Sequence, residues 1–348
     1  MQQLIALGLF SGGLDSILAC RTVAEQGVQV IGLKFVTPFF DSHLLECKEE
    51  YQREVRAKYG LKVELVDLSR GYLSLLHNPT HGFGKYCNPC IDCKILMLST
   101  ARSLMASYGA SFLVTGEVVG QRPMSQRRDA MRIIERDSGC TGLLLRPLSA
   151  QLLPPTFVEA EGMVDRARLH GFSGRGRRPQ MELARRFGMT EHPNPAGGCL
   201  LTDPNLGSRI KALFQGSLGG AGDRLSLEDV HLILTGRQFQ IHGKHWLVVG
   251  RNQGENQRIR ALCREGDWLL ATTTHPGPTA LLRRAAATVA REEQETVMCQ
   301  AAGIVVRYSK KVDNRPVPAE VQIERGAQSE CRQFMPSDED LVRSWQLS

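Results

Sequence analysis

Short apolar runs alternate with amphipathic stretches through the first 120 residues. The apolar runs predict buried strands at 4–10, 28–36, 61–68 and 111–115. The stretches between them predict helices at 17–25, 43–59 and 92–108. Strands that alternate with helices in this way predict a parallel sheet that is covered on both faces. We therefore expect a doubly wound α/β domain whose ligand site lies beyond the carboxyl ends of the strands.

The pattern changes beyond residue 120. Further helices are predicted at 124–135, from the capping residue Thr156 to 169, and at 180–187, with a fifth strand at 143–148. The segment 69–91 is longer than an ordinary connection and is predicted to be a functional loop. Strand-like alternation at 237–250 and a helical stretch at 283–302 predict a smaller α+β domain. We place the domains at 1–204 and 205–348.

Length and composition fit a two-domain protein of a reducing compartment. The chain has 348 residues, and no stretch approaches the roughly 20 apolar residues of a membrane span. Residues 1–3 lead into the first strand without a basic region, so we expect no signal peptide, no membrane association and a cytoplasmic location. Ten cysteines, three of them clustered at 87–93, make a poor disulfide framework.

Positive charge is concentrated in the middle of the chain. The net charge is +7, and residues 121–187 contain 13 Arg, no Lys and 7 acidic residues. Arginine forks suit phosphates, so this region is predicted to contact RNA, although a solvated surface or linker remains an alternative. The arginines proposed for this contact are Arg122, Arg127, Arg128, Arg175, Arg177 and Arg178.

The turn from Ser11 to Ser16 joins the first predicted strand to the first helix. Gly12 and Gly13 let the backbone approach a ligand, and the N–H groups at a helix start attract a phosphate. Asp15 cannot bind phosphate directly, so we assign it to Mg²⁺. A tight turn that merely caps the helix is the alternative. Residues at the ends of the second and fourth strands would complete a nucleotide pocket: Lys34, Phe35, Thr115 and Gly116.

A second candidate site is built from cysteines. Cys87, Cys90 and Cys93 form a CxxCxxC pattern before a predicted helix, and Cys199 follows Gly197 and Gly198. Thiolates at this spacing hold iron–sulfur clusters or zinc. Buried, inert cysteines are the alternative.

The motifs in the first 200 residues resemble those of the PP-loop ATP pyrophosphatases, and among them the tRNA 2-thiouridylases. The shared features are the SGGxDS loop at 11–16, the Asn-Pro segment at 88–93, the Thr-Gly strand end and the late Cys199. The resemblance implies an adenine nucleotide α-hydrolase-like fold that binds Mg·ATP and adenylylates its acceptor. It implies that Cys90, Cys93 and Cys199 hold a [4Fe–4S] cluster, with zinc as an alternative and the role of Cys87 open. Residues 117–122 depart from the usual His-Tyr-Ala of the 2-thiouridylases, which leaves the modified nucleotide open.

The C-terminal part resembles the NFACT-R RNA-binding domain over about 237–325. The resemblance rests on a Gly-Arg-Asn-x-x-x-Asn turn at 250–256 and a later Pro-Gly loop at 276–277, with His275 before it. It implies that Arg251, Asn252 and Asn256 contact RNA. An ordinary α+β accessory domain is the alternative.

Together these features predict ATP-dependent tRNA thiolation by Asp15, Cys90, Cys93 and Cys199. Two alternatives are a PP-loop ligase or sulfur-transfer enzyme for a small molecule, and a non-catalytic RNA-binding protein with a structural metal cluster. The sulfur donor, the modified position and the oligomeric state stay open.

Overall fold

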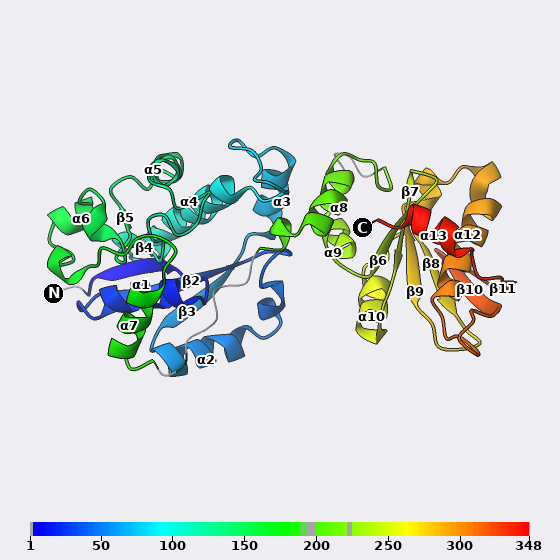
Figure 1. The fold of residues 1–348 in the computed structure, drawn as a ribbon, viewed down its shortest axis with the longest axis horizontal. Coiled ribbons are helices and arrows are strands. Elements are labelled where there is room, and N and C mark those ends of the chain that lie inside the picture. Colours follow the sequence, from blue (N-terminus) through cyan, green and yellow to red (C-terminus); the bar gives the residue numbers. More distant parts are fainter. Residues whose placement is uncertain (1–2, 190, 192–198, 221–224, 348) are drawn as a thin grey trace. The chain divides into compact units, whose positions relative to one another are not determined.

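The computed structural model describes residues 3–189, 191, 199–220 and 225–347. The chain divides into two compact units, Met1–Thr202 and Asp203–Ser348, which we call the N-terminal unit and the C-terminal unit (Figure 1). Among the described residues, none of the helices combines the length and the apolar content needed to cross a bilayer.

A five-stranded parallel sheet forms the centre of the N-terminal unit, in the order β3-β2-β1-β4-β5 (Figure 1). Its strands are β1 (Ile5–Leu9), β2 (Gln29–Val36), β3 (Lys62–Asp67), β4 (Phe112–Thr115) and β5 (Leu144–Leu145). The predicted parallel sheet is confirmed.

Helices cover both faces of this sheet. On one face Ala6 and Val30 pack against α1 (Leu14–Ala24), α2 (Lys48–Tyr59), α6 (Phe157–Ala160) and α7 (Arg178–Arg186). On the other face Leu7 and Leu33 pack against α4 (Cys90–Tyr108) and α5 (Arg128–Asp137). Neighbouring residues of one strand point to opposite faces, so both faces are buried and the unit is doubly wound, as predicted.

Several predicted boundaries in this unit are wrong. The helix expected at 124–135 is α5, which starts only at Arg128, and the strand expected at 143–148 is the two-residue β5. The helix expected at 43–59 is a 3₁₀ turn, Ser42–Leu45, followed by α2, because Cys47 has non-helical φ and ψ. The connection 69–91 contains α3 (Ser69–His77), which buries Tyr72 and Leu76. The helix begun by Thr156 stops at Ala160, because Gly162 adopts a left-handed φ of 67°.

The C-terminal unit has a six-stranded antiparallel sheet in the order β11-β10-β8-β9-β7-β6, so the predicted α+β class is confirmed (Figure 1). Its strands are β6 (Arg237–Ile241), β7 (His245–Val249), β8 (Trp268–Thr272), β9 (Thr279–Arg283), β10 (Ala319–Arg325) and β11 (Gln328–Phe334). Its helices are α8 (Pro204–Phe214), α9 (Leu227–Ile233), α10 (Gln253–Ala261), α11 (Ala285–Thr288), α12 (Gln294–Arg307) and α13 (Glu339–Trp345).

The helix predicted at 283–302 is wrong. Residues 279–283 form β9, which pairs with both β7 and β8, and the long helix α12 starts only at Gln294. Only Arg283 of the predicted helix lies in β9. The rest is interrupted because Val289 and Ala290 have extended backbone, which separates the short helix α11 from the 3₁₀ turn Arg291–Glu293 and α12. Buried residues of α12, among them Ala301 and Val305, cover one face of the sheet.

Candidate active site

A cavity of about 940 Å³ lies in the N-terminal unit at the carboxyl ends of β1, β2 and β4. It collects residues that are far apart in the sequence. Every residue predicted to bind ATP lines it, together with three of the four cysteines of the second candidate site and one predicted RNA contact. These residues are Ser11, Gly12, Gly13, Asp15, Ser16, Lys34, Phe35, Cys90, Cys93, Thr115, Gly116, Arg122 and Cys199.

The turn before α1 is held by its own hydrogen bonds. The Ser16 hydroxyl donates to the Gly13 carbonyl at 2.8 Å, and the Ser11 hydroxyl donates to Ser16 Oγ at 3.2 Å. Gly12 has a left-handed φ of 81°, a conformation that favours glycine. Gly13 is the N-cap and carries no side chain, and Ser16 N donates to its carbonyl at 3.1 Å, so the Leu14 and Asp15 N–H groups are the ones without a side-chain cap at the start of α1.

Lys34 places a buried positive charge behind this turn. Its side chain is only 5 % exposed, and Nζ donates to the Ser11 carbonyl at 2.7 Å and to Asp41 Oδ2 at 2.5 Å. The ammonium thus holds the Ser11 carbonyl at the start of the turn. Because Lys34 also lines the cavity, its charge favours an anion there.

Asp15 presents one oxygen that is ready for a cation. Its Oδ2 accepts a hydrogen bond from Gln121 Nε2 at 2.6 Å, whereas Oδ1 is buried and has no hydrogen-bond partner among the described residues. Glu117 Oε1 and Gln126 Oε1, on side chains that line the same cavity, are also buried without a hydrogen bond among the described residues. Buried acceptors without donors are costly, and oxygen ligands are what Mg²⁺ takes, so Asp15 fits the predicted Mg²⁺ site.

Gly116 lets the end of β4 touch the start of α1. A Cβ atom at this position would lie 2.5 Å from the backbone carbonyl group of Asp15 and 2.6 Å from the Ser16 nitrogen. No side chain fits in that space, so the glycine brings the two predicted halves of the nucleotide pocket together. Thr115 and Phe35 are buried beside it.

The cysteine half of the cavity is built from three segments. Cys90 and Cys93 lie in the first turn of α4, Cys199 comes from the end of the unit, and Tyr72 of α3 hydrogen-bonds the Cys93 sulfur. Burial raises the pKa of Cys93 to about 12 and also raises the pKa of Cys199. Both groups are therefore thiols at neutral pH and must lose a proton before they bind a metal or attack as nucleophiles.

The donor set fits an iron–sulfur cluster or zinc in kind, because three thiols face one cavity. Their arrangement is not that of a closed ligand set: in the part of the chain that the structure describes, no group of three or more His, Cys, Asp or Glu side chains is placed to hold a metal. Cys87 is half-buried and does not line the cavity. Gly197 and Gly198, predicted to bring Cys199 close, lie outside the described residues.

Several residues of the site were missed in the sequence. Tyr72 is one of them, and the apolar spacing of α3 could have identified its helix. Glu117 was expected at the strand end beside the nucleotide pocket, but its contacts were not: this buried carboxylate accepts from Arg146 Nε at 3.1 Å and lies 3.9 Å from Lys94 Nζ. Its location at the strand end after Thr-Gly was visible, but its partner Arg146 was not.

The predicted RNA contacts of the N-terminal unit differ in their surroundings. Arg122 is exposed at the cavity, and Arg128 and Arg175 are exposed elsewhere. Arg127 pairs with Asp129 at 2.8 Å, Arg178 pairs with Glu182 at 3.2 Å, and Arg177 is half-buried. Only Arg122 is thus brought to the predicted ATP pocket, and the RNA role of all six remains a prediction.

In the C-terminal unit the predicted RNA residues also hold the fold. Asn252 caps α10 by accepting from Glu255 N at 3.0 Å, and Arg251 forms an ion pair with Glu255. Asn256 Oδ1 accepts from Thr279 N at 3.0 Å and leaves no room for a Cβ at Gly250. The Gly-Arg-Asn-x-x-x-Asn turn is therefore explained by local structure, and its contact with RNA remains a prediction.

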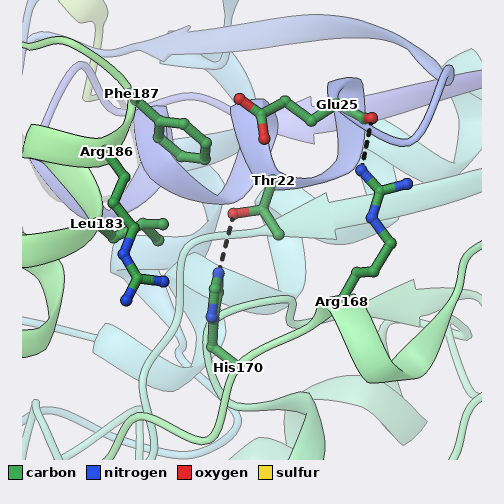
Figure 2. Close-up of a pocket in the computed structure, with 7 residues that line it drawn as sticks. All are labelled: Thr22, Glu25, Arg168, His170, Leu183, Arg186 and Phe187. Atoms are coloured by element: carbon green, nitrogen blue, oxygen red, sulfur yellow. Dashed lines mark hydrogen bonds between the residues drawn. The ribbon is translucent and has the colours of Figure 1, made fainter.

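A smaller cavity of about 190 Å³ lies at the other end of α1, between this helix, α7 and the segment 168–170 (Figure 2). Arg168 Nη2 donates to the Glu25 carbonyl at 2.8 Å, and the His170 ring contacts the Thr22 hydroxyl. Leu183 and Arg186 of α7 line its other side (Figure 2). One face of α1 is thus packed against α7 far from the phosphate turn.

Two family models match the chain. Residues 2–151 match the thiamine biosynthesis protein ThiI, and residues 236–346 match the NFACT protein RNA binding domain. A probable tRNA sulfurtransferase of Thermococcus kodakarensis is 27% identical over 142 residues, which cover 41% of this chain and 36% of that protein. The resemblance to tRNA sulfurtransferases and to NFACT-R is confirmed, and the chain spans about a third of the length of this curated relative.

Three solved structures have parts that are similar to this chain. A 4-thiouridine synthetase–RNA complex with bound ATP is 22% identical, with a TM-score of 0.38 over 60% of this chain and 49% of that chain. The U34-tRNA thiolase NcsA of Methanococcus maripaludis, with its [4Fe-4S] cluster, is 18% identical, with a TM-score of 0.32 over 62% and 67%. The C-terminal part of a fibronectin/fibrinogen-binding protein of Streptococcus suis is 14% identical, with a TM-score of 0.27 over 41% and 65%.

Proposed function

We propose that this protein is an ATP-dependent tRNA sulfurtransferase whose active site is the 940 Å³ cavity. The observation that carries the proposal is that one cavity is lined both by a phosphate turn with an orphan carboxylate oxygen and by three thiols. Phosphate chemistry and sulfur chemistry at one site fit the activation of a base oxygen followed by its replacement with sulfur. The curated relative, a probable tRNA sulfurtransferase, supports the same reading.

The first step is adenylylation. The N–H groups at the start of α1 and the hydroxyls of Ser11 and Ser16 hold the phosphates, and Asp15 holds the Mg²⁺ that binds them. The carbonyl oxygen of the base attacks the α-phosphorus of ATP, and pyrophosphate leaves with the electron pair of the broken bond. Lys34 and the helix start stabilise the negative charge on the phosphates.

The second step is sulfur transfer. Sulfur attacks the activated carbon, a carbon–sulfur bond forms, and the carbon–oxygen bond breaks with AMP as leaving group. A [4Fe–4S] cluster held by Cys90, Cys93 and Cys199 would supply an iron with an open position for sulfur. On a persulfide route one of these cysteines carries the sulfur. A second cysteine then takes the inner sulfur as a disulfide, and a thiol reductant restores both thiols.

The substrate is proposed to be tRNA because of the match to an RNA-binding domain at 236–346 and the arginines at 121–187. Contacts to phosphates should make binding weaken steeply with salt. The sulfur donor and the modified nucleotide are not assigned.

The test is release of AMP and pyrophosphate by the purified protein with Mg·ATP, measured with and without unfractionated tRNA. The proposal predicts release that depends on tRNA and on Mg²⁺. Release that is the same without tRNA would favour a small-molecule substrate, and no release would leave an RNA-binding protein without this chemistry.

A further inference from the structure

Asp15 is the end of a chain of hydrogen bonds that reaches the Arg-rich region. Gln121 Nε2 donates to Asp15 Oδ2 at 2.6 Å, and Gln180 Nε2 donates to Gln121 Oε1 at 3.0 Å. The three side chains come from the start of α1, the loop after β4 and the first turn of α7. Asp15 and Gln121 are 106 residues apart in sequence, and Gln121 and Gln180 are 59 apart. This series of hydrogen bonds therefore exists only in the folded unit.

Because these side chains are buried or half-buried, each donor in this series of hydrogen bonds needs an acceptor, and this decides which atoms donate. Gln180 is 1 % exposed, and a buried amide is costly unless it is hydrogen-bonded. Each glutamine uses an N–H as donor toward Asp15, so the only stable arrangement leaves the carboxylate as the final acceptor. The second oxygen of Asp15, a residue that lines the cavity, is buried and has no donor among the described residues.

The backbone around Gln121 is fixed by the same region. Gly174 N donates to the Val119 carbonyl at 2.8 Å, in an isolated strand bridge between Val119 and Ser173. Gly120, with a left-handed φ of 77°, donates from its N–H to the Gln126 carbonyl at 2.7 Å. The loop that carries Gln121 is therefore attached to the segment that leads into α7.

We propose that Gln121 and Gln180 are positioning residues that set the Asp15 carboxylate for Mg·ATP, which makes α7 a part of the ATP site. The proposal rests on the assignment of Asp15 to Mg²⁺ in the proposed function. It also links two regions that the sequence treats separately. Arg177 and Arg178 precede Gln180 directly, so RNA that contacts these arginines touches the segment that supports Asp15.

The experiment is a double-mutant cycle with Gln121→Met, Gln180→Met and the double variant, since methionine keeps the length of glutamine and removes its donor. Binding of ATP to the full chain is measured by calorimetry, once with Mg²⁺ and once with EDTA. We expect Gln121→Met to weaken Mg·ATP binding about tenfold, the size of losing one hydrogen bond to a charged group, and Gln180→Met to weaken it about fivefold, since its bond to Gln121 is between neutral amides. The double variant should be no weaker than Gln121→Met, and ATP binding in EDTA should stay within about twofold.

Leu183→Ala is the matched control, because it removes buried packing from the same helix without touching the hydrogen bonds. Thermal unfolding of all variants separates loss of stability from loss of positioning. Additive effects of the two variants, or an equal loss in EDTA, would overturn the proposal. If the unchanged protein binds no Mg·ATP, the proposed function itself fails, which is a different result.

Discussion

The two units of this protein use buried charge in opposite ways. In the N-terminal unit, Asp15 accepts from Gln121, and Glu117 pairs with Arg146 and lies 3.9 Å from Lys94 Nζ. Each of the two carboxylates keeps a buried oxygen without a hydrogen bond among the described residues. In the C-terminal unit, Asp229 is fully buried and both of its oxygens accept from arginines, with Arg283 Nε at 2.8 Å. Arg283 continues to Asp267 at 2.7 Å. The carboxylates of the N-terminal unit keep an acceptor oxygen for a ligand. The carboxylates of the C-terminal unit are paired with arginines and stabilise the fold.

The largest effect is expected from Cys199→Ser, which tests the sulfur half of the cavity. Serine keeps the shape of the residue and removes the thiol, so sulfur transfer to tRNA should fall below detection, while Mg·ATP binding stays within about twofold. Thionucleosides and ATP affinity are measured on the same preparation. Cys331→Ser, at an exposed position, is the control and should keep full activity. Full activity of the Cys199 variant would remove that cysteine from the site.

The ion pairs of Asp229 and Asp267 with Arg283 and Arg284 in the C-terminal unit should affect stability but not ATP binding. Asp229→Asn removes the carboxylate that Arg284 pairs with and one of the two that Arg283 pairs with, and breaking a buried ion pair costs roughly 3–5 kcal/mol. Urea unfolding measures this loss. Mg·ATP binding by the folded variant should not change, and a change would break the contrast between the units.

The open carboxylate should give the reverse result. Asp15→Asn keeps an acceptor for Gln121 but lowers the charge at the orphan oxygen, so tRNA-dependent pyrophosphate release should fall roughly 10²–10³-fold, as for other lost electrostatic contacts in active sites. Unfolding in urea should change by less than about 1 kcal/mol. A loss of stability as large as that of Asp229→Asn would show that Asp15 is structural.

A smaller effect is expected where the two parts of the nucleotide pocket touch. Gly116→Ala forces a methyl group to within 2.5 Å of the Asp15 backbone, and such overpacking costs about 1–3 kcal/mol. ATP binding should weaken with it. Gly71→Ala, where the nearest atom would be 3.5 Å away, is the control in the same unit and should be tolerated.

The smallest effect concerns a partly exposed pair of the C-terminal unit. The hydrogen bond from Arg264 lowers the pKa of Glu228 from 4.5 to about 2. A lowered carboxyl pKa stabilises the fold above pH 4.5, and this contribution is lost as the pH falls from 4.5 toward 2. The side chain is 34% exposed, so the contribution at pH 7 is screened to below about 1 kcal/mol.

Glu228→Gln should therefore be slightly less stable than the unchanged protein at pH 7, with a difference that shrinks below pH 4.5. Urea unfolding at pH 7, 5, 4 and 3 follows it. A constant difference over this range would mean that Glu228 acts through packing rather than charge.

How well the sequence predicted the site depends on how local each contact is. The phosphate-binding turn from Ser11 to Ser16 could be predicted because strand, turn and helix follow one another in sequence. The rest of the nucleotide pocket could be predicted because the carboxyl ends of parallel strands meet at one edge of the sheet. The hydrogen bonds of Gln121 and Gln180 could not, because Gln121 bonds Asp15 across 106 residues and Gln180 bonds Gln121 across 59. Tyr72 was hidden for the same reason, in a connection that was taken for a loop and is the helix α3.

The fold follows the same rule. The parallel sheet was predicted because its apolar runs are continuous and fully buried. Strand β9 was not, because Thr279–Arg283 has no alternation of apolar and polar residues and its place between β7 and β8 follows only from tertiary pairing. Helix ends at Cys47 and Gly162 were set by single backbone conformations that the apolar pattern does not contain.

The most direct test of the account is mass spectrometry of total tRNA nucleosides from cells that lack this gene, compared with the same cells carrying the unchanged gene or the Cys199→Ser form. The account predicts that one thionucleoside disappears on deletion, returns with the unchanged gene and stays absent with the variant. Thionucleosides that are identical in all strains would contradict it.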